Sequence, residues 1–159
     1  MTDRLTEIAV QLDALDAADF DDLNAGADGM RRLYAITDEL AGRTDPEAWA
    51  PPLFHLLERL DTADLGSPGP VVHLLERSAG PGYHGLLADS VRRKPTPLTV
   101  WMVNRVLNAG PADPGTWLEL LAGVERVPGA SPETAAEARQ FLAYQRSLRA
   151  GGPYPDAAD

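Results

Sequence analysis

The chain has 159 residues, of which 44% are hydrophobic, and this suits one globular domain with a single core. It contains no cysteine, which excludes disulfides, thiolate nucleophiles and cysteine-based zinc sites. Its net charge of −10 disfavours direct binding to the phosphate backbone of nucleic acids.

The chain begins MTDRLTEIAV, which lacks the apolar run of a signal peptide. No stretch approaches the roughly 18 apolar residues of a membrane span. The absence of cysteine also fits a reducing compartment. We therefore expect a soluble cytoplasmic protein without membrane contact.

The negative charge is unevenly distributed along the sequence. Residues 1–48 carry a net charge of −8, residues 49–110 carry +1, and residues 111–159 carry −3. An acidic surface attracts a cationic partner, and it also keeps a protein in solution. The charge distribution is compatible with both roles.

Helical patterns are dense, and no segment shows the alternation of a β-strand. We predict eight helices, at residues 3–16, 29–41, 46–61, 69–79, 82–94, 97–109, 114–126 and 132–149. The acidic segment 16–29 is predicted to be a loop, with a short turn near Phe20 to Leu23. Residues 151–159 are predicted to be a flexible tail.

Four dipeptides mark helix starts by placing a capping side chain before a proline. Such a side chain can accept a hydrogen bond from the first turn, where the missing N–H of proline costs nothing. The four dipeptides are Asp45-Pro46, Thr96-Pro97, Asp113-Pro114 and Ser131-Pro132.

The links between the predicted helices are only a few residues long, so consecutive helices should be antiparallel neighbours. The predicted fold is all-α, a stack of antiparallel helical hairpins that forms either a HEAT-like α-solenoid or an irregular helical bundle. We expect one helical domain over residues 1–150, with acidic N-terminal helices in 1–45 and the hairpin stack in 46–150.

The sequence HLLER occurs twice, at 55–59 and 73–77. On a helix, the leucines of each copy lie on one side, whereas His55, Glu58 and Arg59 share the opposite side, as do the same residue types in the second copy. Both polar sides should therefore face solvent, and we predict no metal site, cofactor or catalysis. A metal site built on His55, His73 and His84 is the alternative.

The segment TPLTVWMVNRVLNAG, 96–110, is the most informative stretch. Its apolar residues cover an arc of about 200°, which is typical of a helix packed between neighbours. The other side carries Trp101, Asn104, Arg105 and Asn108 at helical spacing. Arginine and tryptophan are enriched at the energetic centres of protein interfaces. In the structural alternative, Asn104 and Arg105 bind carbonyls of the adjacent hairpin and Asn108 helps to close the helix.

Several segments resemble a family of small helical bacterial proteins that are similar to the immunity proteins of polymorphic or contact-dependent toxin systems. They are LGSPGPVVHLLE at 65–76, Tyr83, SVRRKPTPLTVWMVNRVLN at 90–108, and FLAYQ at 141–145. The resemblance covers about residues 65–145, and the acidic first 50 residues lie outside it. It implies a stoichiometric inhibitor that covers the active surface of a toxin.

The sequence thus predicts a non-catalytic protein that binds a basic cognate toxin domain. The residues predicted to bind the partner are Asp19, Asp21, Asp22, Asp28, Trp101, Asn104, Arg105 and Asn108. Because immunity surfaces vary between relatives, the resemblance instead implies that Trp101, Asn104 and Arg105 belong to the scaffold. A helical-repeat adaptor in a regulatory complex is the alternative function.

Overall fold

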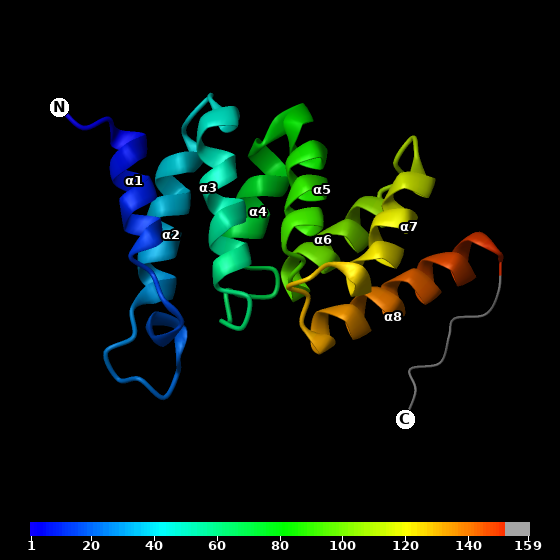
Figure 1. Ribbon diagram of the computed structural model, residues 1–159. Coiled ribbons are helices and arrows are strands. Elements are labelled where there is room, and N and C mark those ends of the chain that lie inside the picture. Colours follow the sequence, from blue (N-terminus) through cyan, green and yellow to red (C-terminus); the bar gives the residue numbers. More distant parts are fainter. Residues whose placement is uncertain (152–159) are drawn as a thin grey trace. The chain divides into compact units, whose positions relative to one another are not determined.

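The computed structural model describes residues 1–151 (Figure 1). Within this range the chain forms helices and no strands, so the predicted all-α class is confirmed. The α-helices in this range are α1 (Arg4–Asp13), α2 (Gly29–Ala41), α3 (Pro46–Arg59), α4 (Gly69–Ser78), α5 (Tyr83–Arg93), α6 (Pro97–Asn108), α7 (Pro114–Gly123) and α8 (Pro132–Arg149). Short 3-10 helices lie at η1 (Ala17–Phe20), η2 (Gly80–Gly82) and η3 (Val124–Arg126). The predicted flexible tail lies outside the described residues, apart from Gly151.

Three of the four predicted caps form at the start of their helices. The side chains of Thr96, Asp113 and Ser131 accept hydrogen bonds from backbone amides three residues later, at 3.2, 3.3 and 3.1 Å. At α6 the bond is reciprocal, because the hydroxyl of Thr99 accepts the amide of Thr96 at 3.0 Å. These local bonds explain why the predicted starts of α6, α7 and α8 agree with the structure.

The predicted cap at Asp45 is wrong. Its carboxylate makes no capping bond and instead accepts two hydrogen bonds from Arg43, at 2.8 and 2.7 Å. A bidentate guanidinium contact is stronger than a bond to a neutral amide. The hydrogen bonds from Arg43 also hold the pKa of Asp45 below its ordinary value.

Residues 1–86 form a compact unit, unit 1, with a core of its own. In it α1 packs against α3 and α2 against α4, and consecutive helices run in opposite directions (Figure 1). The largest side chains that are almost completely buried in this unit are Trp49, Phe54, Leu12, Leu15, Leu33, Leu40, Leu53, Leu56, Leu57, Leu74 and Leu75.

The second compact unit, unit 2, begins at Leu87, and in its described part, residues 87–151, α8 packs against both α6 and α7. The predicted apolar arc of α6 is mostly buried, although Leu98 remains partly exposed. The two units divide inside α5, between residues 86 and 87. A single domain over residues 1–150 stays a prediction.

Helix α3 contains two consecutive prolines, Pro51 and Pro52, beyond its first turn. Neither has an N–H group, so the carbonyls of Glu47 and Ala48 lose their usual intrahelical donors. The residues on either side of the prolines are nevertheless 0 or 1% exposed. Burial of these side chains therefore holds α3 together where its backbone bonding is interrupted.

The cap of α8 can be tested at Ser131. We expect Ser131→Ala to lower the free energy of unfolding by about 1 kcal/mol, because the amide of Thr134 loses its acceptor. Ser131→Asp should retain wild-type stability, since its carboxylate can accept the same amide near the positive end of the helix dipole. Urea unfolding followed by circular dichroism measures both changes, and an equal loss in the two variants would contradict the cap.

Candidate functional site

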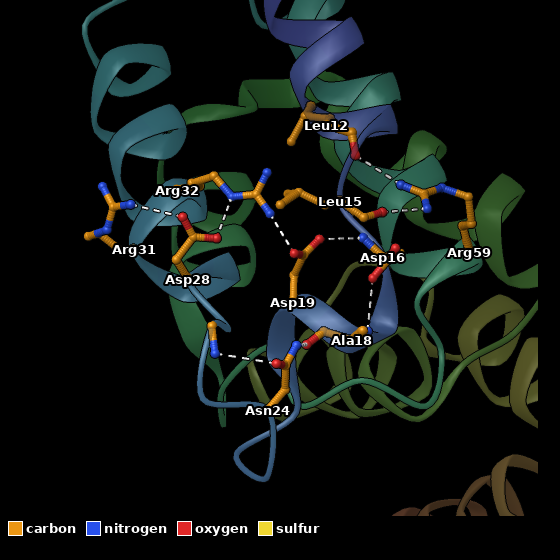
Figure 2. A network of polar contacts seen from close by, with 11 residues as sticks. Leu12, Leu15, Asp16, Ala18, Asp19, Asn24, Asp28, Arg31, Arg32 and Arg59 are labelled. Carbon is orange, nitrogen blue, oxygen red and sulfur yellow. Dashed lines mark hydrogen bonds and ion pairs between the residues drawn. The ribbon is translucent and has the colours of Figure 1, made fainter.

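The acidic loop 16–29 is closed onto the first turns of α2 by Arg32 (Figure 2). One guanidinium nitrogen of Arg32 lies 2.7 Å from Asp19, and its Nε lies 2.9 Å from Asp28. The contact with Asp28 is an ion pair only, because the Nε–H makes no hydrogen bond. Arg31 adds a second contact with Asp28, at 2.9 Å. Two of the aspartates predicted to bind a partner are thus paired within the chain.

Further hydrogen bonds order the loop internally (Figure 2). Asp16 accepts the amide of Ala18, and Asp19 accepts the amide of Asp16, both at 2.9 Å, which caps η1 at its N-terminal end. The side chain of Asn24 donates to the carbonyl of Ala18 at 2.9 Å. The turn expected near Phe20 to Leu23 also forms, because the Asn24 amide donates to the Asp21 carbonyl at 2.9 Å. The loop is therefore a folded element.

The tip of the loop presents Asp21, Asp22 and Leu23 to solvent. Both aspartates are exposed, and Leu23 is 94% exposed. The carboxylate of Asp21 accepts the Leu23 amide at 2.9 Å, which fixes the backbone between them. Two carboxylates and one apolar side chain thus project together from a hydrogen-bonded turn. Leu23 was not among the residues predicted from the sequence.

The connection between α3 and α4 lies at the same end of unit 1 as the loop (Figure 1). Arg59, the last residue of α3, binds the end of α1 just before the loop, because its guanidinium donates to the carbonyls of Leu15 and Leu12 at 2.7 and 2.9 Å (Figure 2). We call this part of the molecule the acidic end of unit 1. Its aspartates are Asp13, Asp16, Asp19, Asp21, Asp22, Asp28, Asp61 and Asp64.

A hollow of about 380 Å³ between α1 and α2 is lined by Arg4, Arg31 and Arg32. Arg4 donates two hydrogen bonds to Glu39, both 2.6 Å long. These bonds raise the pKa of Arg4 and lower that of Glu39. Since each of the three arginines is paired with a carboxylate of the chain, the hollow has no excess positive charge with which to bind an anion.

The first copy of HLLER differs from its prediction at one residue. His55 and Arg59 are exposed as expected, whereas Glu58 is buried, with an exposed fraction of 7%. Its carboxylate lies 3.4 Å from the Nδ1 atom of His55. In the second copy, His73 is exposed. Within residues 1–151, no group of three or more histidines and carboxylates is placed to hold a metal ion.

The four residues predicted to bind a partner on α6 make two separate sets of contacts. Arg105 stacks on Trp101, with the guanidinium carbon 4.8 Å from the ring centroid. Asn104 and Asn108 instead share one partner, the side chain of Gln145 on α8, whose amide nitrogen donates to both at 2.7 Å. The asparagines thus join α6 to α8 through a side-chain amide, whereas the structural alternative had Asn104 bind a backbone carbonyl and Asn108 help to close the helix.

Gln145 itself is completely buried and was missed by sequence reasoning. Its carbonyl oxygen accepts a hydrogen bond from Arg149 at 2.9 Å, so both ends of the amide have partners. Each hydrogen bond of this buried amide matters for stability, because a buried donor or acceptor left without a partner costs about 1–3 kcal/mol. The signal was present in FLAYQ, where a glutamine occupies a helical position next to apolar residues.

The closure of the loop can be tested at Gly29. A Cβ atom there would lie 2.7 Å from the Asp19 carbonyl oxygen and 2.9 Å from the Phe20 ring. We expect Gly29→Ala to lower the free energy of unfolding by about 1–3 kcal/mol through overpacking. Gly85→Ala is the matched control, because open space surrounds that helical glycine and alanine favours helices. Chemical denaturation compares them, and equal stability of the two variants would contradict the closure.

The hydrogen bonds from Gln145 to Asn104 and Asn108, which we call the amide clamp, can be tested on α8. We expect Gln145→Leu to cost about 1–3 kcal/mol, because the buried Asn104 loses its donor. The control is Gln140→Leu, the same change at an exposed position of the same helix, which should alter stability by no more than about 0.5 kcal/mol. Thermal and urea unfolding of both variants give the difference, which would vanish if the clamp were unimportant.

Comparison with known proteins gives no family for the chain. No protein-family model matches it, and no curated protein or solved structure shows significant similarity to it. Among the described helices, none has the length and apolar character needed to cross a membrane. The resemblance to immunity proteins stays a prediction, and the function has to be inferred from the residues of the chain itself.

Proposed function

We propose that the chain is a non-catalytic, cytoplasmic protein of the immunity type, which neutralises a cognate bacterial toxin by covering its active surface. The observation that supports this most strongly is the tip of the acidic loop. Two exposed carboxylates and a leucine that is 94% exposed project from a loop held by hydrogen bonds and ion pairs. Such a preordered surface binds without a large cost in conformational entropy.

The charge of unit 1 indicates the chemistry of the partner. Residues 1–86 contain sixteen acidic and six basic residues. Four of the six arginines are paired with carboxylates of the chain, and Arg59 and Arg77 donate to backbone carbonyls. The remaining acidic excess attracts a cationic protein and accelerates its association. A basic toxin domain is such a partner.

The structure also suggests different roles for the four predicted aspartates. In our proposal Asp21 and Asp22 face the partner, whereas Asp19 and Asp28 hold the loop through Arg32. Leu23 enters an apolar recess on the partner, where burial of a leucine contributes about 1.5–3 kcal/mol. Carboxylates then guide the encounter, and the apolar contact extends the lifetime of the complex.

Rescue of growth tests the proposal directly. Immunity genes characteristically stand directly downstream of their toxin genes, so the protein encoded immediately upstream should be expressed alone and together with this chain. We expect growth arrest in the first case and normal growth in the second, with a stable complex on purification. A helical-repeat adaptor would bind another partner and give no rescue. Toxicity that this chain does not relieve would refute the immunity function.

The contribution of the loop tip can be measured on the purified complex with an inactivated toxin. We expect Asp21→Asn/Asp22→Asn to slow association several-fold at low salt and to weaken the salt dependence of the rate. Asparagine at position 21 can still accept the Leu23 amide, so the turn is retained. Leu23→Ser should instead accelerate dissociation.

The matched control for the loop tip is Asp38→Asn/Glu47→Gln. It removes the same charge from exposed positions, one late in α2 and the other in the first turn of α3, both away from the loop. Stopped-flow binding measures both double variants. If the control slows association as much as the change at the tip, the general charge of the chain and not the loop guides the encounter.

A further inference from the structure

The described part of unit 2 has a small net charge that is opposite in sign to that of unit 1. Its described residues, 87–151, contain eight basic and six acidic residues, against six and sixteen in unit 1. Helix α6 contains no acidic residue, and neither does α8 from Arg139 to its end. The exposed arginines on these two segments are Arg105, Arg139, Arg146 and Arg149. Arg139 forms an ion pair with Glu125 at 3.3 Å, so its charge is already balanced within the chain.

Two of these arginines are held in place by neighbouring side chains. The guanidinium carbon of Arg105 lies 4.8 Å from the centroid of the partly exposed Trp101 ring, a cation–π contact that restricts the arginine side chain. Arg149 is held through Gln145, which also binds Asn108. Asn108 is one helical turn from Arg105 on α6, and Gln145 connects it to Arg149 on α8.

We infer that Trp101, Arg105, Asn108 and Arg149 form a second protein-contact surface, which binds the carboxylates of an acidic segment of a partner protein. We call these four residues the arginine surface. A guanidinium presents paired donors that match the two oxygens of a carboxylate. Arg105 already has another interaction within the chain, and its five N–H donors allow it to keep that interaction while it binds a ligand.

The size and charge of the surface favour protein carboxylates over nucleic acid. Binding to a nucleic acid requires several phosphate contacts, and a chain with a net charge of −10 repels the rest of the backbone. One or two carboxylates need only one or two guanidiniums, and at physiological salt, charges more than about 8 Å away are largely screened. Trp101 supplies the aromatic contact area that protein interfaces commonly use.

This inference rests on the proposed function only in treating the chain as a protein-binding protein. The acidic end of unit 1 is tested with a cationic partner, whereas the arginine surface is tested with an acidic peptide. Failure of one test therefore leaves the other intact. The probe is the peptide acetyl-Ala-Glu-Ala-Glu-Ala-amide, and the same peptide with glutamine in place of glutamate is the uncharged comparison.

The readout is the indole N–H resonance of Trp101 in the full chain, assigned with Trp101→Phe and followed by NMR during titration at physiological salt. We expect a saturable shift with the glutamate peptide and none with the glutamine peptide. Arg105→Gln should weaken binding about threefold, the size of one partly exposed ion pair. Arg105→Lys keeps the charge but loses the paired N–H donors of the guanidinium. Its affinity for the glutamate peptide should therefore lie between those of the wild type and Arg105→Gln.

The matched control is Arg126→Gln, which removes an equal charge from an exposed arginine on η3. It should leave the affinity unchanged. If it weakens binding as much as Arg105→Gln, or if the Trp101 resonance does not move, the inference is overturned. Arg149→Gln provides a second variant on α8, so the test does not depend on the stability of the Arg105 variants; an unchanged affinity there would remove Arg149 from the surface.

Discussion

The burial of apolar helix faces is the interaction on which the rest of this structure depends. The α-helices within residues 1–151 are short, from 10 residues in α1 to 18 in α8. Helices of about 12–15 residues or fewer are marginal in water by themselves, so these helices persist because they pack on one another. Helix α3 shows this most clearly, because its packing compensates for two interior prolines. Caps and ion pairs then adjust where each helix begins and how each loop is held.

The helices could be predicted from the sequence because their signals are local. Thr96, Asp113 and Ser131 cap residues only three positions away, and the apolar spacing of α6 follows from its own twelve residues. The errors occur where another contact competes or where distant residues meet. Asp45 is bound by Arg43, and Glu58 is buried by tertiary packing, although its helical position suggested exposure. The clamp between Asn104 and Gln145 spans 41 residues, beyond any helical pattern.

The candidate site was predictable in composition but not in the roles of its residues. The acidic character of loop 16–29 was evident, and the i, i+4 spacing of Trp101 and Arg105 anticipated their contact. The paired aspartates could be told from the exposed ones only once the position of Arg32 was known. The exposure of Leu23 at the loop tip was likewise not evident from the sequence. The two units also differ in their balance of charge. Unit 1 holds the acidic excess, and the described part of unit 2 has a small basic one.

The close approach of Gly29 to Asp19 and Phe20 has a consequence for how this loop can evolve. Gly29 is buried and a larger side chain there would have to displace its neighbours, so this position tolerates little change. The side chains of Asp22 and Leu23 are exposed, so a change at either position should cost the fold very little. Substitutions at these two positions can therefore accumulate while the supporting turn stays the same.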